Sequence, residues 1–145
     1  MASRKLTDLS EPVMNGAIAM IAACKACNRA GYDVLIYCTL RSLQEQDELF
    51  SRGRDNAGRV INASRVVTYA RGLQSLHNPD LNGKAWAFDA VPMNGGKLLW
   101  NDKAALLVMG RCGEAAGLEW AGRWTGKLRE SVHFQIKPKS EYLHA

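Results

Sequence analysis

Two of the three histidines in this 145-residue chain, His77 and His133, lie in patterns that could place them with acidic side chains in a metal-binding or catalytic site. His133 alternates with apolar residues in a run typical of a β-strand, so its side chain is predicted to face away from the core. His77 lies in a polar loop before a second apolar run, which Asp89 interrupts. A buried carboxylate is costly unless it is paired or binds a metal. Two imidazoles and one carboxylate are a ligand set of catalytic zinc, which keeps its fourth position for water.

A hydrolytic zinc site also needs a proton acceptor and a positive group. Glu130 precedes His133 by three residues, so a turn could place its carboxylate beside the metal, where it could move a proton. Arg41 follows an apolar run over residues 34–39 and is the candidate for stabilising a developing oxyanion. Arg41 could instead pair with Glu45 on the following helix. We predict that Glu130 and Arg41 are catalytic.

Three helices and several short strands are expected to position these residues. Ser10-Glu11-Pro12 can begin a helix that Gly31 would end, and Ser42-Leu-Gln-Glu45 is a capping box that begins a second helix. The apolar positions of the first helix predict its buried face, which is Met14, Ala17, Ile18, Ile21 and Ala22. A third helix is predicted over 102–116, and strands over 34–39, 66–69, 85–91 (ended by Pro92), 118–120 and 132–136. Together they predict a small α+β domain, with helices packed on a short antiparallel sheet and the zinc site in a surface cleft.

Four motifs occur in the order found in the D-alanyl-D-alanine-peptidase-like zinc metallopeptidases. They are the run from Tyr37 to Ser42 with Gln46, then Ser75-Leu-His77, Ala87-Phe-Asp89 and Glu130-Ser-Val-His133-Phe-Gln135. The stretch Gly117-Leu-Glu-Trp120, with Gly122 and Trp124, also resembles the family, although Ala121 stands where a glycine is usual. Within the family, the chain is most similar to phage endolysins that are L-alanyl-D-glutamate endopeptidases. The resemblance covers residues 37–135.

This resemblance implies a zinc peptidase that hydrolyses peptidoglycan stem peptides. The implied site residues are the zinc ligands His77, Asp89 and His133, the base Glu130, the substrate or carbonyl contact Arg41, and the lesser substrate contacts Ser75 and Gln46. Trp120 or Trp124 could line the substrate cleft, and Glu119 is expected to be a solvated carboxylate. Ser75 could instead only cap a turn.

Asp80 is a competing candidate for the oxygen ligand. In the family pattern the Asp follows the His by seven positions, whereas Asp89 follows His77 by twelve, so Asn78–Lys84 looks like an insertion in a loop. We favour Asp89 because its strand fixes the direction of its side chain. The inserted loop is expected to influence how the cleft closes around the ends of the substrate.

Composition narrows the possible partners. The chain is 47% hydrophobic and 23% charged, as in a globular domain, and its net charge of +5 is spread out without a block of like charges. An anionic cell-wall polymer fits this charge, whereas a nucleic-acid-binding domain would need a clustered basic face. The most apolar stretch, residues 17–24, is too short to span a membrane, and no signal peptide is recognised. Cys24 and Cys27 form a CxxC pair within a helical pattern, which favours reduced, buried thiols.

These observations together predict a monomeric, single peptidase domain over residues 1–145 that binds Zn²⁺ and peptidoglycan, without nucleic acid or stable membrane insertion. The expected role is that of a phage endolysin, made in a host cytoplasm and released to the cell wall through a holin-type pore. Two alternatives remain open. One is a D-alanyl-D-alanine carboxypeptidase, and the other is a non-catalytic zinc-containing wall-binding module, which would not need Glu130.

Overall fold

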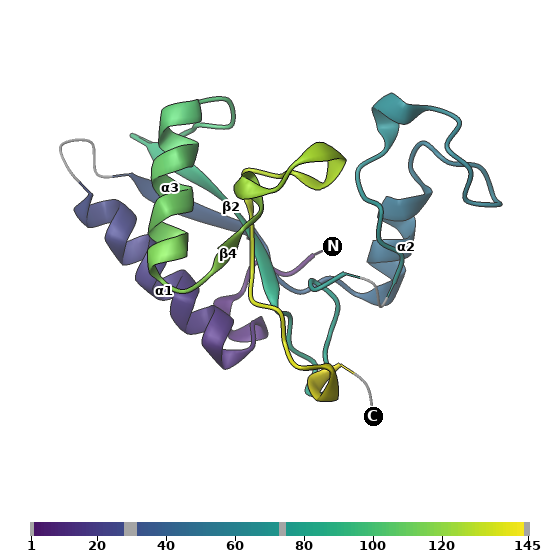
Figure 1. Cartoon of the computed structure of the whole chain (residues 1–145), viewed down its shortest axis with the longest axis horizontal. Coiled ribbons are helices and arrows are strands. Elements are labelled where there is room, and N and C mark those ends of the chain that lie inside the picture. The colour runs from purple at the N-terminus through teal and green to yellow at the C-terminus, as the bar shows by residue number, and fades with distance from the viewer. Residues whose placement is uncertain (1, 28–31, 73–74, 144–145) are drawn as a thin grey trace.

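An antiparallel sheet forms the centre of the molecule, and two long helices lie side by side across it (Figure 1). The computed structural model describes residues 2–27, 32–72 and 75–143. Within these residues the strands are β1 (Asp33–Cys38), β2 (Ala87–Asn94), β3 (Lys97–Leu98), β4 (Glu119–Trp120) and β5 (His133–Gln135). The strand order is β1-β2-β5-β4, and β3 pairs with the end of β2. The predicted α+β class and antiparallel sheet are confirmed.

The described helices are of two types, α-helices and short 3-10 helices. The α-helices are α1 (Glu11–Ala26), α2 (Leu43–Ser51) and α3 (Lys103–Ala115). Short 3-10 helices cover Leu6–Asp8, Ala63–Arg65, Ala121–Arg123, Gly126–Leu128 and Ser140–Tyr142. Helices α1 and α3 pack together against the sheet, whereas α2 stands apart, with the irregular segment that follows it (Figure 1). None of the described helices is long and apolar enough to cross a membrane.

Local sequence signals explain where the helices begin. In the predicted capping box, the Ser42 hydroxyl accepts a hydrogen bond from the Glu45 amide at 3.0 Å, and the Glu45 carboxylate accepts one from the Ser42 amide at 2.9 Å. The Asp102 side chain accepts from the Ala105 amide at 3.0 Å and caps α3. The predicted second and third helices are therefore confirmed, and the second helix has its predicted capping box.

The core lies between α1, α3 and the sheet, directly behind the polar residues of β2 and β5. Phe88 and Phe134 are fully buried and stack with ring centroids 5.4 Å apart. Helix α3 approaches the sheet closely because Gly113 carries no side chain: a Cβ there would lie 2.4 Å from the Phe134 ring. This packing fixes the strands that carry Asp89 and His133.

The predicted buried face of α1 is only partly right, because Ala17 is buried and Met14 and Ile21 pack against the core, but Ile18 and Ala22 are exposed. The helix buries Val13, Gly16, Ala17, Met20 and Cys24, whereas Ile18 is 51% exposed. Because small apolar residues occur all round this helix, periodicity alone could not choose its face. Gly16 determines which face is buried, because only a residue without a side chain fits there: a Cβ at that position would lie 2.7 Å from the Leu118 side chain.

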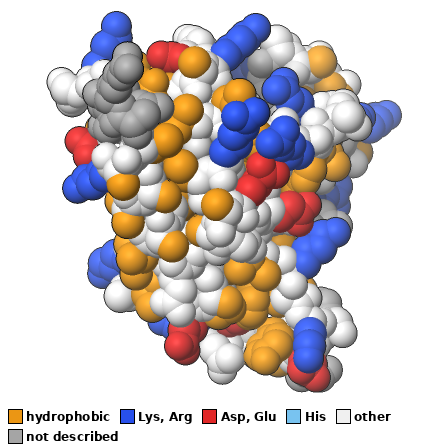
Figure 2. Space-filling view, turned by 60° about the vertical axis from the view of Figure 1, so that its left-hand side comes forward, with side chains coloured by type: hydrophobic (Ala, Val, Ile, Leu, Met, Phe, Trp, Pro, Cys, Tyr) orange, Lys and Arg blue, Asp and Glu red, His pale blue; other side chains and the backbone are white. Residues whose placement is uncertain are grey.

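Figure 2 shows the apolar side chains that remain on the surface scattered over one side of the molecule, with Lys and Arg gathered toward the top of the view.

Two strand predictions also need correction. Residues 66–69 form no strand, because the main-chain carbonyl of Thr68 accepts from the Arg54 side chain at 2.9 Å instead of from another strand. Pro92 does not end β2, which continues to Asn94. The carbonyl of Pro92 accepts a hydrogen bond from the main-chain amide of Leu99, which lies just past the end of the short β3. The N–H that proline lacks would point to the same side, beyond the paired residues of β3, so the sheet loses no hydrogen bond there. The predicted helix end Gly31 and the third histidine, His144, lie outside the described residues.

Candidate active site

Asp89 and His133 are brought together by the register of two neighbouring strands. Asp89 of β2 lies directly opposite His133 of β5, and the next pair, Phe88 and Phe134, points into the core. Alternation along each strand therefore turns both polar side chains to the opposite face. His77 comes from the loop before β2 and is buried, with its Nδ1 2.8 Å from the main-chain carbonyl of Thr39.

The three side chains converge on one carboxylate oxygen. Nε2 of His77 lies 3.3 Å from Oδ1 of Asp89, and Nδ1 of His133 lies 3.2 Å from the same atom. The two imidazole ring centroids are 5.2 Å apart. Two donors bound to one tetrahedral zinc at about 2.0–2.1 Å lie about 3.3 Å from each other. Each nitrogen-to-oxygen separation here, 3.3 Å for His77 and 3.2 Å for His133, is close to that value.

A second donor set shares two of these residues. Cys38, His77 and Asp89 are all buried, and their ligand atoms lie within 4.8 Å of one another. The thiol, however, lies 3.7 Å from Nδ1 of His77, the nitrogen that already faces the Thr39 carbonyl. A cation on that side would be closed off from substrate, whereas His133 lines the open cleft. The arrangement therefore favours His133 over Cys38 as the third ligand.

Electrostatic coupling within this cluster is strong. Burial lowers the pKa of His77, but the Asp89 carboxylate outweighs this effect and raises the pKa to about 10. Burial raises the pKa of Asp89, but His77 and then His133 more than compensate, so the pKa lies well below its ordinary value. Without a metal, His77 therefore holds a proton at neutral pH, and Asp89 is ionised.

Arg41 completes the contacts of Asp89. One guanidinium nitrogen lies 3.4 Å from Oδ2 of Asp89, and another donates to the side-chain oxygen of Gln46 at 2.9 Å. The main-chain amide of Arg41 donates to the carbonyl of His77 at 2.7 Å. Arg41 is thus held by both the sheet and α2, and its predicted alternative partner, Glu45, instead caps α2.

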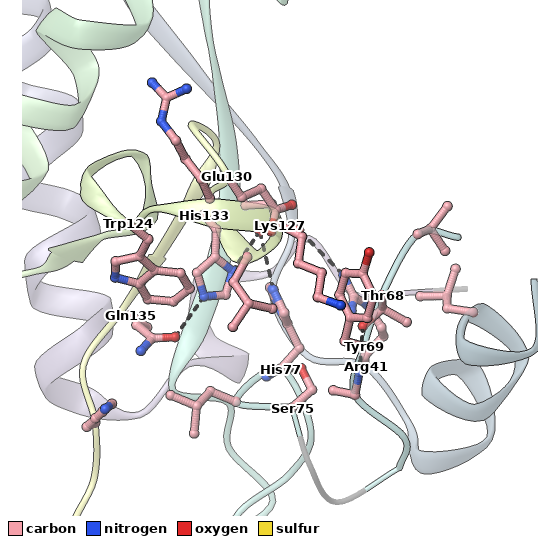
Figure 3. A pocket seen from close by; sticks show the side chains of 18 of the residues that line it. Arg41, Thr68, Tyr69, Ser75, His77, Trp124, Lys127, Glu130, His133 and Gln135 are labelled. Atoms are coloured by element: carbon pink, nitrogen blue, oxygen red, sulfur yellow. Dashed lines mark hydrogen bonds and ion pairs between the residues drawn. The ribbon is translucent and has the colours of Figure 1, made fainter. Parts of the chain in front are cut away.

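Glu130 lies on the rim of the same site, next to His133 and across from Arg41 (Figure 3). Its side chain keeps contact with solvent. Partial burial, and after it the Asp89 carboxylate, raises the pKa of Glu130, while His133 and His77 oppose this shift. A carboxylate with a raised pKa holds a proton more readily than an ordinary glutamate, which suits a group that must accept a proton and give it up again.

The site lies in a cleft of about 1020 Å³, which is lined by the three candidate ligands together with Arg41 and Glu130. We call its side formed by β1, β2 and β5 the sheet wall, and its side formed by residues 66–70 the loop wall. A third side comes from residues 124–130, where the Lys127 ammonium reaches to 5.0 Å from the Tyr69 ring of the loop wall. Tyr37 lies on the sheet wall, and burial, with the Asp89 and Glu130 charges, raises the pKa of its phenol.

The predicted substrate contacts differ in where they lie. Ser75 lines the cleft, and its hydroxyl also accepts from the His77 amide at 3.1 Å. Gln46 is fully buried, so direct contact with substrate does not fit its position. Trp120 is 5% exposed and packs on Gly110, whereas Trp124 lines the cleft.

Two further expectations do not fit the structure. Asp80 is engaged within its own loop, where its carboxylate accepts from the amides of Asn82 and Lys84 and from the Trp86 indole at 2.7–2.9 Å. The loop itself packs on the C-terminal segment, since Leu81 donates to the Tyr142 carbonyl, and it does not line the cleft. The residues that shape the cleft opening are instead 66–70 and 124–130.

Sequence reasoning gave no role to several residues that the structure brings to the site. Tyr37, Lys127 and the loop wall line the cleft. Glu119 is exposed, as expected of a solvated carboxylate, and its carboxylate also accepts hydrogen bonds from Trp124 and Gln135. Gln135 carried one usable signal, because it lies two residues after His133 and therefore on the same face of the strand. The loop wall carried none.

Comparison with known proteins places the chain in a family. It is 34% identical over 141 residues, which cover 91% of this chain and 75% of the relative, to the peptidoglycan L-alanyl-D-glutamate endopeptidase CwlK of Bacillus subtilis. Among solved structures, the Serratia marcescens L-Ala D-Glu endopeptidase ChiX matches its fold with a TM-score of 0.63 and 18% identity, over 94% of this chain and 89% of that one. A scan against protein-family models finds no match. The relationship to CwlK shows that the chain belongs to the D-alanyl-D-alanine-peptidase-like zinc metallopeptidases.

Proposed function

We propose that this chain is a zinc-dependent endopeptidase that hydrolyses the bond between L-alanine and D-glutamate in peptidoglycan stem peptides. The observation that carries the proposal is the convergence of His77, His133 and Asp89 on one point of a cleft beside Glu130. The 34% identity to CwlK, which is named for this bond, supports the choice of substrate.

His77, Asp89 and His133 would hold the zinc ion, because two imidazoles and a carboxylate are a zinc ligand set and each imidazole has a nitrogen 3.2–3.3 Å from Oδ1 of Asp89. When bound, zinc would polarise the scissile carbonyl and make a water molecule more acidic. The protein already prepares this arrangement. The Thr39 carbonyl fixes Nδ1 of His77 as a donor, so Nε2, which faces Asp89, is the nitrogen that would give up its proton and bind the ion.

Glu130 would move the proton. Its carboxylate accepts a proton from the attacking water and passes it to the amine nitrogen that leaves as the peptide bond breaks. The raised pKa of Glu130 suits both halves of this task, since the group must gain and lose the same proton within one turnover. A wall-binding module without catalysis would have no use for an acid at this position.

Arg41 would stabilise negative charge on the substrate. Its contacts with Asp89 and Gln46 orient the guanidinium, which lines the cleft beside the three candidate ligands. Further N–H groups of the same side chain can then donate to the carbonyl oxygen as it gains charge, or to a substrate carboxylate. Ser75 would contact substrate directly, whereas Gln46 and Trp120 would act by supporting Arg41 and the core.

The finer biological role is proposed from the motif resemblance. We place the protein among the phage endolysins, acting as a monomeric single domain on the anionic wall after release from a host cytoplasm through a holin-type pore. The net charge of +5 would favour approach to such a polymer.

Digestion of purified peptidoglycan, followed by mass spectrometry of the products, tests the proposed bond. We expect new amino termini on D-glutamate. Free alanine instead would identify a D-alanyl-D-alanine carboxypeptidase. A chelator should abolish the reaction and added zinc should restore it, whereas digestion that continues in chelator would contradict the metal-dependent mechanism.

A further inference from the structure

The second ring nitrogen of His133 begins a chain of hydrogen bonds that the proposed reaction does not use. Nε2 of His133 lies 2.8 Å from the side-chain oxygen of Gln135, as the dashed line between these two residues in Figure 3 shows. The side-chain nitrogen of Gln135 donates to one carboxylate oxygen of Glu119 at 3.1 Å. The indole nitrogen of Trp124 donates to the other oxygen at 2.8 Å.

Strand geometry brings these side chains together. Gln135 follows His133 by two residues on β5, so both lie on the same face. Glu119 lies directly opposite Gln135 in the pairing of β4 with β5. Trp124 follows β4, lines the cleft, and lies with its ring centroid 5.8 Å from that of His133. Gln135 is 6% exposed, so its amide has little access to water as an alternative partner.

The chemistry of the groups fixes the direction of every bond in this chain. An ionised carboxylate only accepts hydrogen bonds, and an indole N–H only donates them. Glu119 therefore faces the NH₂ end of the Gln135 amide, and the oxygen of that amide must face His133. An oxygen at this position needs a donor, so Nε2 of His133 carries the proton. In the neutral imidazole that a cation requires, Nδ1, the nitrogen that faces Asp89, is then left with its lone pair.

We propose that Gln135, Glu119 and Trp124 form a relay that fixes His133 as its Nε2-protonated tautomer and thereby aims the Nδ1 lone pair at the cation. This inference rests on the proposed function only in assuming that a cation binds there. Gln135 and Glu119 are positioning residues, because they act through His133. Trp124 ties the same relay to the wall of the cleft.

The opposite tautomer shows what the relay prevents. With the proton on Nδ1, His133 would donate to Asp89 and offer no lone pair at the candidate metal position. Nε2 would then be an acceptor facing the oxygen of Gln135, which is also an acceptor. Turning the amide to relieve this conflict would direct its oxygen at the Glu119 carboxylate. The relay thus disfavours the inactive tautomer at two successive contacts.

Zinc affinity, measured by competition with a chromophoric chelator, tests the relay without any activity assay. Gln135→Met removes the acceptor for His133 and should weaken zinc binding by about 10–100-fold. Glu119→Gln should have a similar effect, because one amide oxygen must replace two carboxylate oxygens that serve separate donors. Glu114→Gln, on an exposed acid that pairs with Arg123, is the matched control and should leave zinc affinity unchanged.

Exchanging the two relay residues gives the sharpest test. In Glu119→Gln combined with Gln135→Glu, the new carboxylate can accept from His133 and from the new amide, whose oxygen can accept from Trp124. Every donor again meets an acceptor, so the double variant should recover most of the zinc affinity that Glu119→Gln loses. A double variant at least as weak as Glu119→Gln would overturn the relay, as would single variants that bind zinc like the unmodified protein.

Nitrogen-15 NMR of the unmodified, zinc-loaded protein provides a readout that does not depend on how the variants fold. We expect a slowly exchanging proton on Nε2 of His133, and an unprotonated Nε2 would overturn the proposal. Failure of the proposed function looks different: the protein would bind zinc through Nδ1 of His133 and still leave the L-alanyl-D-glutamate bond intact.

Discussion

The sheet wall and the loop wall face the same cleft but are held in place by different forces. Behind the sheet wall, Phe88 and Phe134 are fully buried and stacked, and the strands that carry Asp89 and His133 pair directly. The loop wall has no strand partner, and Val67 in it is 56% exposed. It is held by side chains instead, since Gln46 donates to the Ala70 carbonyl at 2.7 Å.

This difference separates two tasks. Groups that must meet within a few tenths of an ångström lie on strands fixed by the core, where small displacements are costly. The loop wall, which we expect to face the rest of the substrate, has an irregular backbone, so its side chains can change without disturbing Asp89 and His133. Arg41 stands between the two, because it contacts Asp89 on one side and Gln46 on the other.

The largest expected effect comes from removing the proposed base. Glu130→Gln should lower kcat by about 10²–10⁴-fold, because the amide can no longer accept the proton from water. Zinc affinity should change little, since Glu130 is not one of the three proposed ligands. Glu48→Gln on the exposed side of α2 is the matched control. Full lytic activity of Glu130→Gln would favour a non-catalytic module.

A pair of truncations tests whether the two walls differ in stability. Phe134→Ala should lower the free energy of unfolding by about 3–5 kcal/mol, because it leaves a cavity behind His133 in the core. Val67→Ala should change it by less than about 0.5 kcal/mol, because the side chain is mostly exposed. Urea unfolding measures both. Similar losses for the two variants would show that the loop wall is as tightly integrated as the sheet wall.

Local signals in the sequence were sufficient to predict helix α2 and the strands of the sheet wall. The capping box at Ser42 and the alternation around His133 correctly predicted α2 and the face that His133 occupies. Asp89 stood out because a carboxylate in an apolar strand requires a partner. The structure gives it three partners, in His77, His133 and Arg41.

The loop wall could not be predicted because its contacts are made by residues distant in sequence. Residues 66–69 have the β-branched composition of a strand, yet they lie beside α2 and not beside another strand. Gln46 was expected to be a lesser substrate contact, but its amide is buried between Arg41 and the loop wall. Only the tertiary arrangement distinguishes these roles.

Gln46 therefore offers a way to uncouple the two walls. Gln46→Met should cost about 1–3 kcal/mol of unfolding free energy, because it leaves the Ala70 carbonyl and an Arg41 donor without their partner. KM should rise as the loop wall and Arg41 lose their common support. Gln44→Met, the same change on an exposed position of α2, should alter neither quantity. An unchanged KM in Gln46→Met would mean that the loop wall does not depend on this contact.

The smallest expected effect is a gradual change of zinc affinity with pH, which comes from the protonation of His77 beside the sheet wall. Zinc requires a neutral imidazole, but in the metal-free protein the pKa of His77 is raised to about 10 by Asp89. Zinc binding at about pH 7.5 should therefore release about one proton from His77, and zinc affinity should fall about tenfold per pH unit as pH decreases below this pKa. Calorimetry in two buffers of different ionisation enthalpy measures the release. If zinc binds at that pH without releasing a proton, His77 is already neutral in the metal-free protein. The Asp89 carboxylate then does not keep the His77 imidazole protonated.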